Sequence, residues 1–431
     1  MDTTRATQPL ADSAELRIAA DRLIDGSGAP PVEDAVVVIR GGRIAAVEPA
    51  RADSRATRFA GATILPGLID VHVHLSLPGD ARPYEAVAAE SDDRMIGYGL
   101  HNAAAHLAAG VTTVRDNGSR DRVGFAIRER LLAGAPGPRM LVSGRPITQR
   151  GGHFWWCNGE ADTPGECRDA IDRLVAEGAD HIKVMASGGG TAGTNPGVAS
   201  YPVATLRAIV RAAHSRARLT TAHCRATESI GRAVAADVDC IEHAEFLNPD
   251  GAARREPRVI RRLAEAGTWI SPTLQAYGIH TLERLRATGQ RDTPEVARLD
   301  DELARRLDDV RAFLDAGLGD RLLFGTDAGP FDVAFGRPVL GLRALVSAGL
   351  TPLATITAAT SRPSQAIGID TEVGTVEAGK IADLLVVDGD PSRDISALDD
   401  VVAVYQAGRL VAGSRTRAAP HGDPSPTRAD R

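Results

Sequence analysis

The central part of the chain alternates short apolar runs with longer segments whose apolar residues recur at helical spacing. From residue 63 to residue 369, each run of strand length is followed by such an amphipathic segment. This alternation is typical of a parallel sheet whose strands are connected by crossover helices. The eight predicted strands are Ile64–His74, Val111–Arg115, Arg139–Ser143, His181–Ala186, Leu219–His223, Cys240–His243, Thr268–Pro272 and Leu322–Thr326. The predicted helices are Met95–Ala109, Asp121–Leu132, Cys167–Glu177, Val203–Ala217, Glu228–Ala235, Pro257–Ala266, Thr293–Ala316 and Pro338–Ala348. The pattern therefore predicts an α/β fold with a (β/α)8 TIM barrel.

Shorter β-rich runs flank this middle part on both sides. Residues 14–62 contain alternating runs joined at Gly41 and Gly42, a pair that favours a tight hairpin. Residues 370–413 contain similar runs with glycine turns. Because so few strands do not fold alone, we expect the two segments to form one small β-sandwich domain, with residues 63–369 inserted between them. Residues 1–13 and 414–431 are polar and are predicted to be flexible tails.

The first predicted strand of the middle part ends in two histidines that one valine separates. His72 and His74 belong to the run ILPGLIDVHVHL, and residues two apart on a strand point to the same face. Both imidazoles can therefore reach one point at the carboxyl end of the strand, as metal ligands do. The alternative is a buried strand that contains two histidines by chance, in which case both ring nitrogens of each imidazole need partners in the core.

Composition narrows the classes of partner. The 50 basic and 56 acidic side chains give a formal net charge of −6 and are interspersed along the chain. No basic face suggests nucleic acid, and no polybasic run suggests a membrane surface. No apolar run could span a bilayer, and the first residues lack the apolar core of a signal peptide. We expect a cytoplasmic homo-oligomer with a small-molecule substrate.

The four cysteines do not suggest a disulfide framework. They show no CxxC spacing and are few for a chain of 431 residues. We expect reduced, packed thiols at Cys157, Cys167, Cys224 and Cys240.

Four further residues with metal-binding side chains fall at or near the carboxyl ends of other predicted strands. Lys183 lies in the fourth strand, His223 ends the fifth, His243 ends the sixth, and Asp327 follows the eighth. All of them would face the same mouth of a barrel as the two histidines of the first strand. The alternative for Lys183 is a buried lysine paired with Asp180.

These residues carry a family resemblance. The HVH run at 72–74, the four residues just named and the closing run GTVEAGKIADLLVVDGDP resemble the amidohydrolase superfamily of metal-dependent hydrolases. Within it, IKVMASGG and the RGGH loop at residues 150–153 are similar to the imidazolonepropionase-like branch, which includes Xaa-Pro dipeptidases (prolidases).

The resemblance implies a pair of divalent metal ions. One ion would be held by His72, His74 and Asp327, and the other by His223 and His243. Lys183 would be carbamylated by carbon dioxide and would bridge the two, because a carbamate supplies anionic oxygens where an ammonium would be repelled. Nitrogen and oxygen ligands suit zinc, with manganese, cobalt or iron as alternatives.

The mechanism implied is hydrolysis by a metal-bound hydroxide. Asp327 would accept the proton of the hydroxide and deliver it to the leaving nitrogen. His153 would donate to the developing oxyanion, as the matching histidine does in the resembling branch. The alternative for His153 is a histidine on a surface loop.

Four residues are candidates for binding the substrate: Trp155, Trp156, Tyr201 and Arg225. The aromatic pair either lines a pocket or covers the core from outside, and Tyr201 and Arg225 could bind an anionic group. We expect an amidohydrolase that cleaves an amide-type C–N bond of a dipeptide, an N-acyl amino acid or a related amide. The alternatives are a cyclic-amide, urea or carbamate hydrolase, a deaminase, or an inactive homologue with a binding or structural role.

Overall fold

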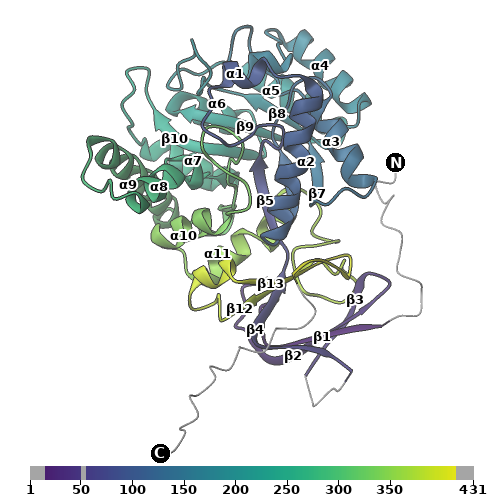
Figure 1. Ribbon diagram of the computed structural model, residues 1–431. Coiled ribbons are helices and arrows are strands. Elements are labelled where there is room, and N and C mark those ends of the chain that lie inside the picture. The colour runs from purple at the N-terminus through teal and green to yellow at the C-terminus, as the bar shows by residue number, and fades with distance from the viewer. Residues whose placement is uncertain (1–14, 50–54, 414–431) are drawn as a thin grey trace, which may run out of the picture.

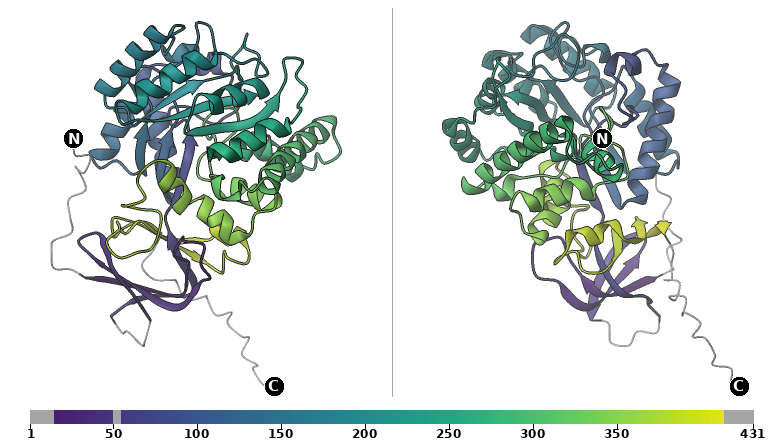
Figure 2. Two further views of the ribbon diagram at one scale, coloured as in Figure 1. Left: turned by 180° about the vertical axis from the view of Figure 1, so that it is seen from behind. Right: turned by 60° about the vertical axis from the view of Figure 1, so that its left-hand side comes forward.

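The computed structural model describes residues 15–49 and 55–413, and the two predicted tails lie outside these ranges. A helix-rich unit stands above a smaller β unit (Figure 1). Both views of Figure 2 show the same arrangement, with the first and last strands of the chain together in the β unit. No helix within the described ranges has both the length and the apolar character needed to cross a bilayer.

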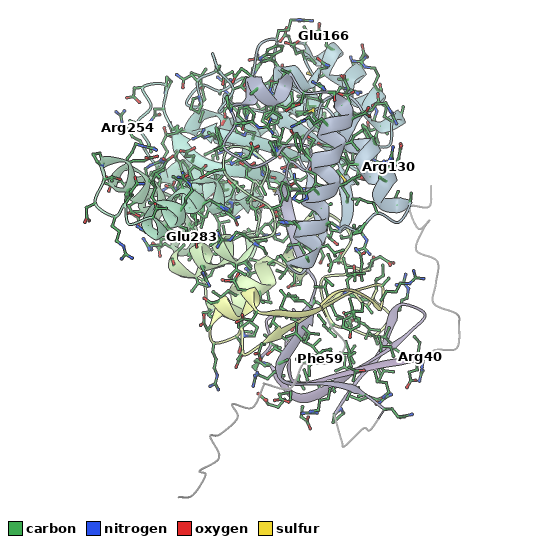
Figure 3. The ribbon with its side chains drawn as sticks, viewed as in Figure 1. Arg40, Phe59, Arg130, Glu166, Arg254 and Glu283 are labelled. Carbon is green, nitrogen blue, oxygen red and sulfur yellow. The ribbon has the colours of Figure 1, made fainter. Side chains whose placement is uncertain are left out.

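The β unit is one seven-stranded sheet built from both ends of the chain. Its strand order is β14-β13-β12-β4-β1-β2-β3, and a bridge between Arg43 and Ile381 brings the edge strand β3 back towards the start of β12. We predicted a small β-sandwich built from these two segments; strands of both segments meet here, and their hydrogen bonds join all seven as one sheet. Its core contains the fully buried Phe59, labelled in Figure 3. The strands are β1 (Leu16–Leu23), β2 (Val32–Arg40), β3 (Arg43–Pro49), β4 (Thr57–Pro66), β12 (Leu384–Asp388), β13 (Val401–Gln406) and β14 (Arg409–Gly413).

Glycines mark two turning points in and next to this sheet. Gly41 and Gly42 have φ values of 56° and 78° between the paired strands β2 and β3, which confirms the predicted hairpin. Gly67 separates β4 from β5 (Leu68–Val73). A Cβ atom at Gly67 would lie 2.2 Å from Oγ1 of Thr112, so the chain can pass this point only without a side chain. The predicted strand Ile64–His74 is therefore two strands that belong to different sheets.

The helix-rich unit contains two parallel sheets. One has the order β5-β6-β7 and the other β11-β10-β9-β8, and a parallel bridge between Ile147 and Val184 links them. The strands after β5 are β6 (Val111–Asp116), β7 (Arg139–Val142), β8 (His181–Met185), β9 (Leu219–Ala226), β10 (Cys240–Leu247) and β11 (Trp269–Ser271).

The eighth predicted strand is wrong in detail. Residues 322–326 form no strand, although Leu323 N donates to Ile270 O over 2.8 Å and Val71 N donates to Phe324 O over 3.2 Å. A Cβ atom at Gly325 would lie 2.9 Å from Cβ of His72, and Asp327 has a left-handed backbone with φ 55°. The left-handed backbone of Asp327 ends the extended conformation, and the segment joins its neighbours on both sides only through isolated contacts.

All eight predicted helices are present in the structure. The helices are α1 (Tyr84–Ala88), α2 (Asp92–Ala108), α3 (Val123–Leu132), α4 (Pro164–Ala176), α5 (Val203–His214), α6 (Thr227–Ala235), α7 (Pro257–Ala266), α8 (Ile279–Ala287), α9 (Pro294–Asp315), α10 (Val339–Ser347), α11 (Pro352–Ala358) and α12 (Ser361–Ala366). Four further α-helices, namely α1, α8, α11 and α12, were missed by the sequence analysis. The short 3-10 helices are Trp155–Cys157, Leu274–Ala276, Gly319–Arg321 and Ile395–Asp399. Helices α8 and α9 pack on each other through a small apolar cluster of their own, formed by Leu282, Leu285, Val296 and Leu299.

Candidate metal centre

One cavity of about 350 Å³ lies where the parallel strands end. Its lining contains all the residues that the sequence predicted as metal ligands, together with His153. The predicted ligands lie on β5, β8, β9 and β10, directly after β5, and at position 327. The ligand candidates in the lining are His72, His74, Lys183, His223, His243 and Asp327.

Three of these residues form a tight group. Nε2 of His72 lies 3.3 Å from Oδ1 of Asp327, and Nε2 of His74 lies 3.6 Å from the same oxygen. The three ligand atoms lie within 4.8 Å of one another. The left-handed backbone at Asp327 and its N–H bond to His72 O, 2.8 Å long, turn this carboxylate towards β5. Two imidazoles and a carboxylate at this separation are a suitable donor set for one divalent ion.

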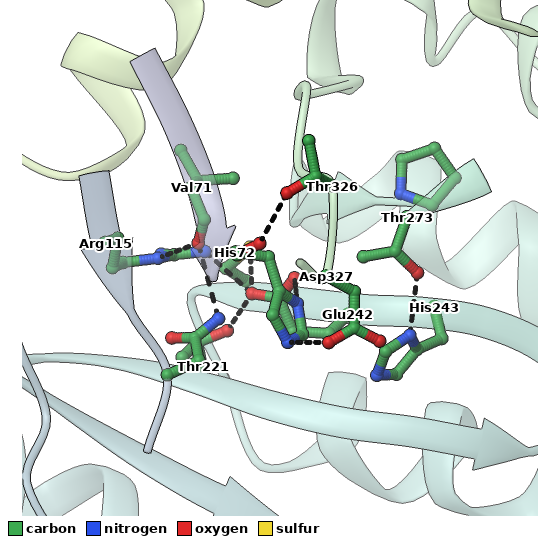
Figure 4. Close-up of polar contacts among 12 residues, drawn as sticks. Val71, His72, Arg115, Thr221, Glu242, His243, Thr273, Thr326 and Asp327 are labelled. Carbon is green, nitrogen blue, oxygen red and sulfur yellow. Dashed lines mark hydrogen bonds and ion pairs between the residues drawn. The ribbon is translucent and has the colours of Figure 1, made fainter. Parts of the chain in front are cut away.

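Hydrogen bonds on the far side of each ring fix which nitrogen is free. Nδ1 of His74 lies 3.0 Å from Gly118 O, and a carbonyl accepts only from an N–H, so the lone pair of His74 is on Nε2. Nδ1 of His72 lies 2.8 Å from Oε2 of Glu242 (Figure 4). A carboxylate likewise accepts that proton and leaves the Nε2 lone pair of His72 facing Asp327.

Glu242 is a buried carboxylate with several hydrogen-bond partners, and the sequence analysis missed it. Its Oε1 accepts from Arg115 over 2.7 Å and from the hydroxyl of Thr221, as Figure 4 shows. Burial acts to raise the pKa of Glu242, but His72 and Arg115 outweigh it and hold that pKa well below its usual range. The carboxylate is therefore ionised. The available signal was an acidic residue in the otherwise apolar run that leads into His243.

The second group of ligand candidates lies beside the first. The ring centroids of His223 and His243 are 4.4 Å apart, and those of His72 and His243 are 5.1 Å apart. Nε2 of His223 donates to Gly188 O over 3.1 Å, which leaves its Nδ1 free. Nδ1 of His243 lies 2.7 Å from Oγ1 of Thr273. Burial lowers the pKa of both imidazoles well below the usual value, so both are neutral and can act as ligands.

Lys183 is almost fully buried in this cavity. Its Nζ has no hydrogen-bond partner among the residues that the structure describes. Burial lowers its pKa, although Glu242 and Asp327 act in the opposite direction. The alternative pairing with Asp180 is excluded, because Asp180 accepts instead from Arg128 over 2.7 Å and from Val142 N over 2.8 Å.

His153 lies inside the cavity and not on the surface. Its ring centroid is 4.6 Å from that of His223. The hydroxyl oxygen of Thr191 accepts from Phe154 N over 3.1 Å and lies 2.8 Å from Nδ1 of His153. The hydroxyl proton can therefore be donated to Nδ1, which leaves the ring proton on Nε2. Burial lowers the pKa of His153 well below its usual value, so the neutral ring keeps that N–H as a donor.

Only one of the four predicted substrate residues lines the cavity. Arg225 does so, and its Nε donates to Glu245. Trp155 is 46% exposed and Trp156 stacks beneath Phe154, and neither belongs to the lining. Tyr201 is fully buried, and its hydroxyl donates to Ala161 O over 2.6 Å. Trp156 and Tyr201 therefore belong to the core, whereas Trp155 lies largely at the surface.

Aromatic residues that the sequence analysis did not single out form another wall. Tyr84 and Phe331 meet edge to face with centroids 5.3 Å apart, and both line the cavity. A Cβ atom at Gly190 would lie 2.5 Å from the ring of Phe331 and 2.9 Å from that of Tyr84. The glycine run after β8 therefore lets the backbone pack directly on these rings. No local pattern marks either ring, because α1 has only 5 residues and the loop after Asp327 has no regular secondary structure.

Comparison with known proteins decides the family. The model of the amidohydrolase family matches residues 63–411, which include every residue of the ligand group. The chain belongs to the amidohydrolase family. As a member it is a hydrolase of amide-type bonds, which confirms the resemblance predicted from its motifs.

Three related proteins illustrate the similarity of this amidohydrolase to others. Ochratoxinase of Aspergillus niger is 27% identical over 451 residues, which cover 93% of this chain and 88% of that protein. Imidazolonepropionase of Agrobacterium fabrum is 26% identical over 405 residues, covering 85% and 86% respectively. A crystal structure of a Xaa-Pro dipeptidase with methionine bound in its active site has a TM-score of 0.78 and 26% identity, covering 92% of this chain and 99% of that one.

Proposed function

We propose that this amidohydrolase uses two metal ions to hydrolyse the amide bond of a small substrate that carries a free carboxylate. The observation that carries the proposal is the convergence of five ligand candidates and Lys183 on one cavity, where the buried Nζ of this lysine has no hydrogen-bond partner among the described residues. Losing ligands would be expected of an inactive homologue, and here all six are present. The presence of Lys183 also argues against a deaminase, since deaminases of this superfamily generally lack the bridging lysine.

The side chains fit divalent metal ions. His72, His74 and Asp327 would hold one ion, and His223 and His243 would hold the second. The donors are imidazole nitrogens and a carboxylate, with no cysteine among the cavity-lining residues in the described part of the chain, which suits zinc before manganese, cobalt or iron. When bound, such ions lower the pKa of a water molecule and polarise the substrate carbonyl.

Lys183 would serve as a carbamate. Carbon dioxide reacts with a neutral amine, and burial favours the neutral amine of Lys183 because it penalises the ammonium. The resulting carboxylate would supply oxygens to both ions. It would also give partners to a side chain that otherwise has none among the described residues.

Asp327 and His153 would handle the proton and the developing charge. Burial raises the pKa of Asp327, although His72 and Lys183 act to lower it, and a raised pKa favours a carboxylate that accepts a proton. Asp327 would take the proton of the attacking water and return it to the leaving nitrogen. The Nε2–H of His153 would donate to the carbonyl oxygen as negative charge develops there.

The position of Arg225 is the reason to propose a free carboxylate on the substrate. Its side chain lines the cavity and is 22% exposed, and its Nε donates to Glu245. Within the described part of the chain, the two terminal nitrogens have no hydrogen-bond partner, so the planar fork is available for a bidentate anion. N-acyl amino acids and dipeptides present such a carboxylate near the scissile amide.

We also propose that the two parallel sheets form one closed (β/α)8 barrel. The parallel bridges Ile147–Val184, Ile270–Leu322 and Val73–Ala328 support this, because together they connect the edges of both sheets. A closed ring would bring all the strand ends to the same mouth.

A hydrolysis screen tests the proposed function. Apoprotein reconstituted with zinc and bicarbonate is given N-acyl amino acids, dipeptides, lactams, ureas and carbamates, with amine and ammonia release measured separately. We expect release of a free amino acid from N-acyl amino acids or dipeptides. Turnover confined to lactams, ureas or carbamates would exclude the proposed substrate class. Ammonia release would indicate deamination, and no turnover in any class would favour an inactive homologue.

A further inference from the structure

Strand β10 ends in a strained stretch of backbone. His243, Ala244 and Phe246 all have left-handed conformations, with φ values of 67°, 51° and 59°. The pairing of β10 with β9 shifts register between His243 and Leu247. Residues other than glycine adopt this conformation only at a cost that the surrounding structure must offset. The imidazole of His243 therefore depends on whatever holds this segment in place.

A buried arginine from a distant helix holds this segment. Arg306 of α9 is fully buried and donates to the carbonyl of His243, to Ala244 O over 3.2 Å and to Pro272 O over 3.2 Å. Asp309 Oδ2 accepts from Nη1 of Arg306 over 2.5 Å. A guanidinium that satisfies three carbonyls at the ends of β10 and β11 fixes the backbone from which His243 projects.

The same arginine supports the adjoining wall of the cavity. Its guanidinium carbon lies 4.6 Å from the ring centroid of Tyr277, which lines the cavity. The preceding residue, Arg305, donates to Glu245 over 3.2 Å. Two consecutive arginines of α9 therefore hold the end of β10 from one side.

We propose that Arg306 is a positioning residue that sets the imidazole of His243 for the second metal ion. This inference rests on the proposed binuclear site, in which His223 and His243 hold that ion. Arg306 reaches only the second group of ligands. Its loss should therefore weaken the binding of the second ion and leave the binding of the first ion unchanged. A residue that merely docks α9 would weaken both sites or neither.

Metal titration of apoprotein with bicarbonate present tests this role. The variant Arg306→Met keeps an apolar chain of similar length but removes the donors, and Arg306→Lys keeps the charge with fewer fixed donors. We expect the second ion to bind about 10–100-fold more weakly in Arg306→Met, with a smaller loss in Arg306→Lys and unchanged affinity for the first ion. Arg311→Met is the matched control, since Arg311 lies on the same helix, is 48% exposed and bonds to Asp308.

Two outcomes would overturn the inference. One is a folded Arg306→Met protein with wild-type affinity for both ions, and the other is an equal loss at both sites. If Arg306→Met does not fold, the same comparison is made with Arg306→Lys, whose wild-type affinity at both sites would equally count against the role.

A metal-free readout separates this inference from the proposed function. Ring signals of [¹⁵N]histidine are recorded on apoprotein, with the His243 signal identified by its loss in His243→Gln. We expect that signal to shift in Arg306→Met or Arg306→Lys and to stay in place in Arg311→Met. A wild-type protein that takes up no second ion would contradict the binuclear site, whereas an unshifted His243 signal would contradict the role of Arg306.

Discussion

Glu242 accepts the Nδ1–H of His72 across 2.8 Å in a fully buried environment. The bond leaves the Nε2 lone pair of His72 facing Asp327, 3.3 Å away. Arg115 balances the charge of the Glu242 carboxylate from the other side over 2.7 Å. The ring orientation of His72 is thus set by a carboxylate that does not itself line the cavity.

Replacing Glu242 by glutamine should weaken metal binding. The amide lacks the charge that Arg115 and His72 share, so the ring of His72 loses its fixed orientation. We expect the affinity for the first metal ion to fall about 10–100-fold, measured by chelator competition on folded protein. Glu228→Gln is the control, because Glu228 is 65% exposed and its ion pair among the residues that the structure describes is with Arg232 on its own helix. Unchanged affinity in Glu242→Gln would refute the orienting role.

Replacing Asp327 by asparagine should separate metal binding from catalysis. Asparagine keeps an oxygen donor but cannot accept and return a proton. We expect metal content to persist while kcat falls about 10²–10⁴-fold, the usual contribution of a general base. Elemental analysis and steady-state kinetics on the same sample measure both quantities. Activity close to that of the wild type would rule out Asp327 as the proton carrier.

Replacing Arg225 by glutamine should affect substrates according to their charge. A charge-assisted hydrogen bond contributes roughly 1.5–3 kcal/mol, so KM for an N-acyl amino acid should rise about 10–100-fold, while the matching amino acid amide changes little. Arg305→Gln is the control, since Arg305 also binds Glu245 but does not line the cavity. Equal effects on both substrates would mean that Arg225 does not bind the carboxylate.

Asp116 should make the stability of the apoprotein depend on pH. Burial raises the pKa of Asp116 to about 7, although hydrogen bonds from Leu75 N and Gly118 N act to lower it. The folded state therefore binds the proton more tightly than the unfolded state, in which the pKa is about 3.9. Stability contributed by the neutral carboxyl is present at low pH and is lost as the pH rises from about 4 to about 7.

Urea unfolding of the wild type and Asp116→Asn at pH 5 and pH 8 measures this effect. Asparagine stays neutral, and its oxygen can accept the 2.8 Å bond from Leu75 N. We expect the wild type to lose ~2–3 kcal/mol relative to the variant between the two pH values. A difference between the proteins that does not change with pH would contradict the raised pKa.

The sequence predicted most of the strands and helices because their signals are local. Strand β6 was predicted as Val111–Arg115 and is Val111–Asp116, because its first four residues are all β-branched and favour a strand locally. The eighth strand failed because its geometry depends on contacts that are distant in sequence. Gly325 packs against His72, and Asp327 turns left-handed to reach it. Hydrophobic pattern cannot report such packing.

The ligand candidates could also be predicted, because their signals are local too. The residues that orient them could not be predicted. His72 and His223 lie at or near the carboxyl ends of the strands that the pattern predicts. Glu242 lies 170 residues from the histidine that it orients, and Arg306 lies 63 residues from His243. The orientation of aromatic side chains on loops could not be predicted either. Tertiary packing turns Tyr201 towards Ala161 O and away from the cavity.

Metal analysis of the reconstituted wild type is the most direct test of the binuclear site. Apoprotein is loaded with zinc in the presence of bicarbonate, freed of excess metal, and analysed for zinc per chain beside Lys183→Met prepared in the same way. The account predicts two ions per chain in the wild type, and fewer in the variant because the bridging carbamate cannot form. One ion or none in the wild type, or two in Lys183→Met, would contradict it.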